Sequence, residues 1–212
     1  MSRLRPLSKP RPPASQPATL SEVHADRAVD AAAVAFVLAH LDAEKPLLWI
    51  QDRLSRKETG RPCLAGLPRP FRILHVDVSR PVDVLWAMEE GLRCRALGGV
   101  LGEVWGDPQA LDFTATKRLA LRSEAQNVPA WLIRRAAQAG LSAARDRWRL
   151  RSLPALRHPD DARAPGDPMW RAERFRSRWD KTGTWVARLE EGALRLDLGM
   201  ESQSLPAAQA LS

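Results

Sequence analysis

The chain has 212 residues, of which 44% are hydrophobic, and its formal net charge is +8. This length supports one sizeable hydrophobic core with appendages. No run of about 18 apolar residues occurs, so we expect no membrane-spanning helix.

The positive charge is concentrated in two flanking segments. Residues 1–18 carry four basic and no acidic groups, and residues 134–190 carry 14 basic and seven acidic groups. The part between them is nearly neutral. A polyanion or an acidic protein surface is the natural partner of such flanks, and a solvated basic surface is the alternative.

The N-terminal segment and the two cysteines exclude some classes of protein. Residues 1–18 are rich in proline and arginine and lack the apolar stretch of a secretory signal, so we expect a basic, disordered tail. Cys63 and Cys94 have no metal-ligand spacing and make no disulfide framework. We expect two reduced thiols in a cytoplasmic protein.

Strand and helix signals alternate from residue 19 to residue 134. Strand candidates lie at 19–24, 47–50, 73–76, 99–104 and 129–133. The uninterrupted apolar runs among them are typical of strands buried on both faces. Helices are predicted at 26–42, after Pro81, and from the N-cap Asp112 to about Gln126. This rhythm predicts a three-layer α/β domain at 19–134 with a parallel sheet and right-handed crossovers.

The helix after Pro81 has its large apolar residues on one face, which we expect to be buried. They are Val82, Leu85, Trp86 and Leu92. Glu89 and Glu90 lie in the same helix. For these two carboxylates, a salt bridge to Arg93 or Arg118 is a better explanation than catalysis.

After residue 134 the pattern changes, and residues 135–198 read as a basic, β-rich extension. Two strands at 184–189 and 193–196 flank Glu191-Gly192, the spacing of a hairpin with a tight turn. Residues 158–168 read as a loop, and residues 199–212 as a flexible tail.

Arginine alternates with aromatic residues in this extension, and the alternation has two interpretations. A half-buried strand places arginine outward and tryptophan inward, whereas a nucleic-acid site uses both for phosphates and bases. We interpret Trp148, Trp170, Trp179 and Trp185 as structural. The outward arginines remain candidate contacts to a partner protein or to DNA. These candidates are Arg145, Arg147, Arg149, Arg151, Arg171, Arg174, Arg176 and Arg178.

The junction after the first strand lacks the residues of a phosphate-binding loop. Residues 24–30 read HADRAVD, without glycine, lysine, serine or threonine, and the chain contains no Gly-Lys dipeptide. Asp26 and Asp30 would repel phosphate at a helix N-terminus. Glu103 ends an apolar strand, and we interpret it as a polar strand-end residue rather than a Mg²⁺ ligand. No catalytic residue, cofactor or metal is predicted, and a cryptic ATPase is the alternative.

Several stretches together match the pattern of one known family. The most specific are RPVDVLWAMEEGLRC at 80–94, VLGE at 100–103 and DFTATKRLAL at 112–121; further matches lie at 20–25, 27–33, 46–51 and 145–149. On these residues the chain resembles the ImuA family, relatives of RecA and of the cell-division inhibitor SulA. The resemblance covers about residues 20–190.

This resemblance implies a RecA-like core without a working phosphate loop, and no catalytic residue carries over from it. It further implies an accessory protein of translesion synthesis and mutagenesis in the SOS response to DNA damage. The implied partner is an ImuB-like homologue of Y-family polymerases, with RecA, an error-prone replicative-type polymerase and DNA as further candidates at the nucleoid. The alternative is a SulA-like inhibitor of cell division that binds a tubulin-like protein.

Overall fold

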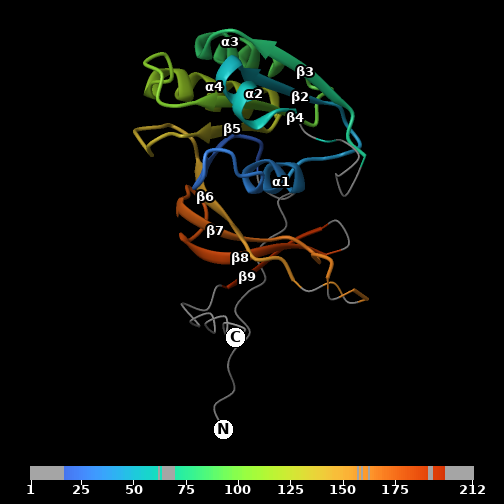
Figure 1. Ribbon diagram of the computed structural model, residues 1–212. Coiled ribbons are helices and arrows are strands. Elements are labelled where there is room, and N and C mark those ends of the chain that lie inside the picture. Colours follow the sequence, from blue (N-terminus) through green and yellow to red (C-terminus); the bar gives the residue numbers. More distant parts are fainter. Residues whose placement is uncertain are drawn as a thin grey trace.

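A computed structural model describes residues 17–61, 63, 70–156, 158, 160–161, 163–190 and 193–198 (Figure 1). Its strands form one nine-stranded sheet in the order β3-β2-β4-β5-β1-β6-β7-β8-β9. The strands are β1 Leu20–Ala25, β2 Leu47–Asp52, β3 Ile73–Val78, β4 Gly99–Trp105, β5 Ala130–Arg135, β6 Asp146–Leu153, β7 Met169–Arg176, β8 Gly183–Glu190 and β9 Ala193–Leu198.

The sheet has a parallel part and an antiparallel part. Every pairing from β3 to β6 is parallel, and β7, β8 and β9 are added antiparallel beyond β6. The expected boundary at residue 134 falls inside β5, and residues 146–198 continue the same sheet because β6 pairs with β1. The hairpin of β8 and β9 agrees with the sequence, whereas its turn and both terminal tails lie outside the described residues.

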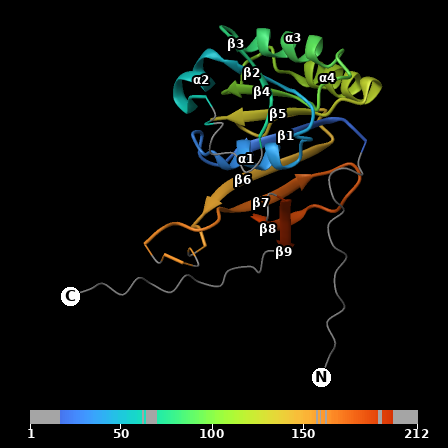
Figure 2. The same cartoon turned by 90° about the vertical axis from the view of Figure 1, so that its right-hand side faces the viewer.

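Helices cover both faces of the parallel part, as expected for three layers (Figure 2). The helices are α1 Ala32–Ala39, α2 Arg53–Thr59, α3 Pro81–Gly91 and α4 Phe113–Gln126. Helix α1 packs on one face against Val23, Trp49 and Leu101, and α3 and α4 pack on the other against Leu20, Ile50 and Val100. Gly102 in β4 leaves room for Met88 of α3, whose Sδ would lie 2.2 Å from a Cβ at that position.

The tryptophans of the extension mostly confirm their structural interpretation. Trp148 and Trp170 are buried in the core under α1, and Trp185 packs against that core. The rings of Phe36 and Trp148 lie 5.0 Å apart between centroids. Trp179 differs, because its side chain is exposed.

The helix expected at 26–42 is shorter in the structure. It begins at Ala32, and residues 26–31 form a loop. The backbone of this loop has other partners: Asp26 N–H donates to the carbonyl of Leu150 over 2.8 Å, and the carbonyls of Ala28 and Asp30 accept from Arg135 Nη1 over 3.0 and 2.7 Å. The prediction failed because alanine-rich sequence favours helix locally, whereas these contacts come from distant strands.

Two burial predictions were also wrong, the second only in part, because Leu85 and Leu92 are buried as expected. β3 is the edge strand of the sheet, so its apolar run is not covered on both faces, and Leu74 and Val76 are exposed. In α3 the buried residues are Val84, Leu85 and Met88, whereas Val82 and Trp86 face outward. Helical spacing identifies an apolar face, but the position of the sheet beneath the helix decides which residues are covered.

Other local predictions are confirmed. Asp112 caps α4 by accepting a 2.7 Å hydrogen bond from Ala115 N–H, and Pro81 occupies the first turn of α3. Glu89 pairs with Arg118 over 2.9 Å, and Glu90 with Arg93 over 3.3 Å. Cys63 and Cys94 are free thiols. Among the described residues, no helix has the length and apolar character needed to cross a bilayer.

His40, directly after α1, makes the stability of the fold depend on pH. Burial lowers its pKa from 6.5 to about 4, and its Nδ1–H donates to the Phe36 carbonyl over 2.7 Å. The unfolded chain therefore binds the extra proton first, so stability is complete above pH 6.5 and falls as the pH drops toward 4. We expect a loss on the order of 2 kcal/mol, since partial exposure moderates the effect.

Urea denaturation at several pH values measures this dependence. His40→Asn keeps a donor for the Phe36 carbonyl and removes the titrating ring, so its stability should change less over the same range. Identical pH profiles for the two proteins would contradict the assignment to His40.

Candidate functional site

An arginine side chain occupies the inner side of the loop after β1. Arg135, at the end of β5, donates from Nη1 to the carbonyls of Ala28 and Asp30 over 3.0 and 2.7 Å. Its guanidinium is almost wholly buried. The loop therefore directs two carbonyl oxygens inward onto a cation of the protein itself.

Glu103, near the C-terminal end of β4, neutralises this cation. Its Oε1 lies 2.8 Å from Nε and 2.6 Å from Nη2 of Arg135. Its Oε2 accepts hydrogen bonds from Trp49 Nε1 and Gln51 Nε2. Both carboxylate oxygens are thus already bonded to donors of the protein, which agrees with a structural role at the strand end.

Asp30 is held in the loop by neighbouring donors. Its Oδ1 accepts from Ser152 Oγ over 2.6 Å, and its Oδ2 accepts from Ser152 N–H over 2.9 Å. Burial acts to raise the pKa of Asp30, but the bonds from Ser152 and Ala32 outweigh burial and lower it. The carboxylate is charged at neutral pH and ties the loop to β6. In the described part of the chain, no group of three or more His, Cys, Asp or Glu side chains is arranged to hold a metal.

The structure separates the candidate arginines of the extension into three groups. Arg147 and Arg174 are largely buried, since their side chains are 6% and 13% exposed. Arg145, Arg176 and Arg178 lie where β6 begins and β7 ends, and Arg145 pairs with Glu124 over 2.8 Å. The remaining three are Arg149, Arg151 and Arg171, which lie together on one face of β6 and β7.

Arg147 and Arg174 serve the interior. Arg147 Nε donates to the buried Glu22 over 2.7 Å, and Ser142 Oγ donates to the other oxygen of Glu22 over 2.6 Å. Burial acts to raise the pKa of Glu22, yet the contacts with His24, Arg147 and Ser142 outweigh burial and lower it. Arg174 stacks between Trp148 and Trp185, with its guanidinium carbon 5.1 Å from each ring centroid.

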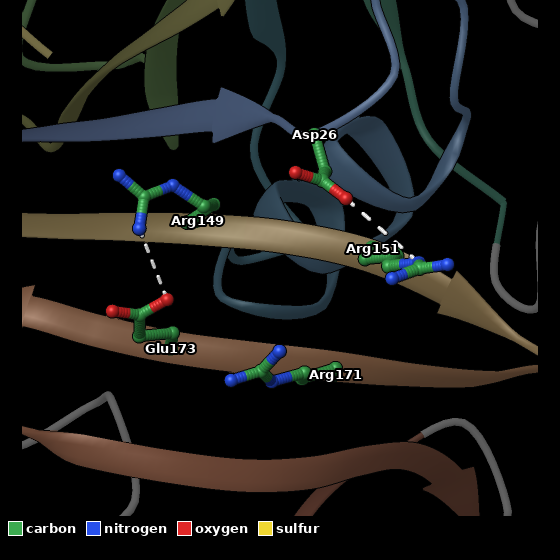
Figure 3. A pocket seen from close by; sticks show the side chains of 5 residues that line it. All are labelled: Asp26, Arg149, Arg151, Arg171 and Glu173. Carbon is green, nitrogen blue, oxygen red and sulfur yellow. Dashed lines mark hydrogen bonds and ion pairs between the residues drawn. The ribbon is translucent and has the colours of Figure 1, made fainter.

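Arg149, Arg151 and Arg171, with Asp26 and Glu173, line a shallow hollow that we call the arginine face (Figure 3). Arg149 pairs with Glu173 over 3.1 Å, and Arg151 approaches Asp26 to 3.8 Å. Because Trp148, Leu150, Trp170 and Ala172 point into the core under α1, these alternate residues point to the opposite side of the sheet.

A second surface feature is apolar. Leu74 and Val76 of β3 lie on the same side of the sheet as α3, which exposes Val82 and Trp86, the latter by 67%. We call these four residues the β3–α3 patch. Leu74 and Val76 belong to β3, which has no partner strand on its outer side among the described residues. Exposed apolar residues grouped beside a free strand edge are typical of protein contact surfaces.

Sequence reasoning missed Arg135, Glu173 and Asp26 as members of these sites. The available signal for Arg135 was its position after an apolar strand, like that of Glu103. Two strand-end residues of opposite charge can meet only if their strands are neighbours, and the order β4-β5 was not known from the sequence. Asp26 was noted as a charge near a phosphate position, not as a partner of Arg151.

Comparison with known proteins assigns no family or function to these sites. No protein-family model matches the chain, and no curated protein matches it significantly.

Arg135 should be essential to stability because it holds strand ends and loop together. We expect Arg135→Met to lower the free energy of unfolding by about 3–5 kcal/mol, as the change leaves Glu103 buried without its cation. Urea denaturation measures the loss. Arg118→Met is the matched control, since its ion pair with Glu89 lies at the surface and should contribute about 0–1 kcal/mol. Equal losses for the two variants would refute this role.

Proposed function

We propose that this protein is a non-catalytic accessory factor of DNA-damage-induced translesion synthesis, with a degenerate RecA-like core that docks a Y-family-like polymerase homologue. The resemblance to the ImuA family supplies the process and the partner. The α/β sheet with helices on both faces of its parallel part is compatible with such a core.

The main observation in support of a non-catalytic role is that Arg135 occupies the inner side of the loop after β1. A phosphate-binding loop turns backbone N–H groups toward the anion and adds a lysine. Here the carbonyls of Ala28 and Asp30 turn inward to a guanidinium, and Glu103 is bonded to that same guanidinium. These contacts support a loop that has a structural role in place of nucleotide binding.

The docking part of the proposal needs a surface suited to another protein, and the β3–α3 patch fits that need. Trp86 is a large aromatic residue on a stable helix, and Leu74 and Val76 extend the apolar area beside it. Buried tryptophan is a frequent energetic centre of protein interfaces. We assign this patch to the polymerase homologue.

MgATP should not bind to the full-length protein at micromolar concentrations. The expected isothermal titration is flat up to millimolar nucleotide, because Arg135 and the Asp30 carboxylate occupy the surroundings of the loop. A dissociation constant in the micromolar range would instead support an ATPase and remove the basis of the non-catalytic assignment.

The partner assignment is tested by affinity purification from cells with damaged DNA. The wild-type chain should recover a Y-family-like polymerase homologue, and Trp86→Ala should weaken that interaction by about 2 kcal/mol or more, roughly 30-fold. Leu121→Ala on α4, where the side chain is 49% exposed, is the control. Both changes should alter stability by less than about 0.5 kcal/mol. Recovery of a tubulin-like division protein without any polymerase would favour the SulA-like alternative.

A further inference from the structure

We infer that the arginine face is a site for the phosphate backbone of a nucleic acid, with Arg151 and Arg171 as its principal contacts. This inference deepens the function proposed above and rests on it for the cellular setting. The sequence named eight candidate arginines without distinguishing between them; the structure points to Arg149, Arg151 and Arg171.

No helix among the described residues covers the second side of β6–β9. Helix α1 packs under β6–β9 on one side, through Trp148, Trp170 and Ala187. Helices α3 and α4 pack on the strands from β3 to β1 and leave the other side of β6–β9 open (Figures 1 and 2). Arg149 and Arg151 are accordingly 42% and 53% exposed, and Arg171 is exposed as well.

Two arginines with like charge are neighbours on this face. Arg151 and Arg171 are directly opposite each other in the register of β6 and β7. Like charges in this position repel each other and destabilise an antiparallel pair. Within the described residues Arg171 has no carboxylate partner, whereas Arg149 and Arg151 each have one (Figure 3). An anion bound between Arg151 and Arg171 would replace repulsion with two favourable contacts.

An aromatic ring and a buried ion pair hold the arginines of this face in place. The guanidinium carbons of Arg147 and Arg149 lie 5.1 and 5.2 Å from the ring centroid of Phe175. The buried ion pair of Arg147 with Glu22 fixes the first of these groups. Arg149 is thereby held between Phe175 and Glu173, which reduces the conformational entropy that it would lose on binding an anion.

The arginine face lacks exposed apolar anchors for a protein and stacking surfaces for bases, which favours phosphate as its ligand. None of the large apolar side chains that are exposed in the described part of the chain belongs to the open side of β6–β9. An acidic protein would find charge there but no apolar anchor. Trp148, Trp170 and Trp185 point to the core, so bases have no stacking surface among the residues that line the hollow. A repeated phosphate needs only cations and suits this face better.

The experiment is a fluorescence anisotropy titration of labelled duplex and single-stranded DNA with the full chain at several salt concentrations. Arg171→Gln should weaken binding by roughly five- to tenfold at about 0.1 M salt and lower the log–log salt slope by about 0.9 on duplex DNA or about 0.7 on a single strand. Arg151→Gln/Arg171→Gln should lose about twice that slope. Arg93→Gln, an equal change of charge at the far end of α3, is the control and should bind like the wild type.

Asp26→Asn provides a readout that misfolding cannot imitate. It removes a carboxylate from the hollow and releases Arg151, so DNA binding should become tighter. Equal binding by Arg171→Gln and Arg93→Gln, or a flat salt response of the wild type, would overturn the inference. So would displacement of DNA by polyglutamate at an equal concentration of charge, because the site would then accept an acidic protein.

Failure of this inference is distinguishable from failure of the proposed function. Copurification of the polymerase homologue depends on the β3–α3 patch, at the opposite edge of the sheet from β9. If Arg171→Gln still recovers the polymerase homologue but DNA binding is absent in all proteins, only the nucleic-acid site is refuted. If DNA binding follows the expected order and no polymerase is recovered, the proposed role in translesion synthesis is refuted instead.

Discussion

The buried pair of Arg135 and Glu103 lies at the centre of a hydrogen-bonded network that links four strands with the loop after β1. Around it runs a continuous chain of hydrogen bonds from His75 in β3, through Gln51 in β2 and Glu103 in β4, to Arg135 in β5. Arg135 then bonds to the loop after β1. Four neighbouring strands and one loop are thus fixed relative to one another near the edge where α/β sheets usually bind ligands. Burying these charges costs free energy, which the completed bonding offsets.

Because internal bonds occupy the strand ends, the surfaces of the sheet are the candidate functional regions. The parallel part is covered by helices on both sides, and four of its exposed apolar residues form the β3–α3 patch at one edge. In the described part of the chain, a helix covers the antiparallel strands on one side only, and the other side carries the arginine face. A single sheet thus presents two surfaces of different chemistry, and we propose that the apolar one binds a protein and the cationic one binds phosphates.

The two surfaces are far apart in the strand order, which allows two partners to bind at once. β3 and β6 are separated by β2, β4, β5 and β1. With neighbouring strands about 4.8 Å apart, the separation is roughly 24 Å. An adaptor that holds a polymerase homologue near nucleic acid needs such a separation, and it needs no nucleotide cycle to maintain it.

The sequence by itself determined the secondary structure wherever a local signal was sufficient. The apolar strands, Pro81 in the first turn of α3 and the Asp112 cap of α4 belong to this class, because propensity and capping act over a few residues. Residues 24–30 also showed, without any structure, that glycine and lysine are missing from the loop. Only the tertiary structure decided where α1 begins, that Trp86 faces outward and that β3 is an edge strand, because each depends on which element lies beside it. The separation of Arg147 from Arg149 has the same cause: alternation along β6 places both on one face, but Arg147 is buried beside Glu22 of the neighbouring strand β1.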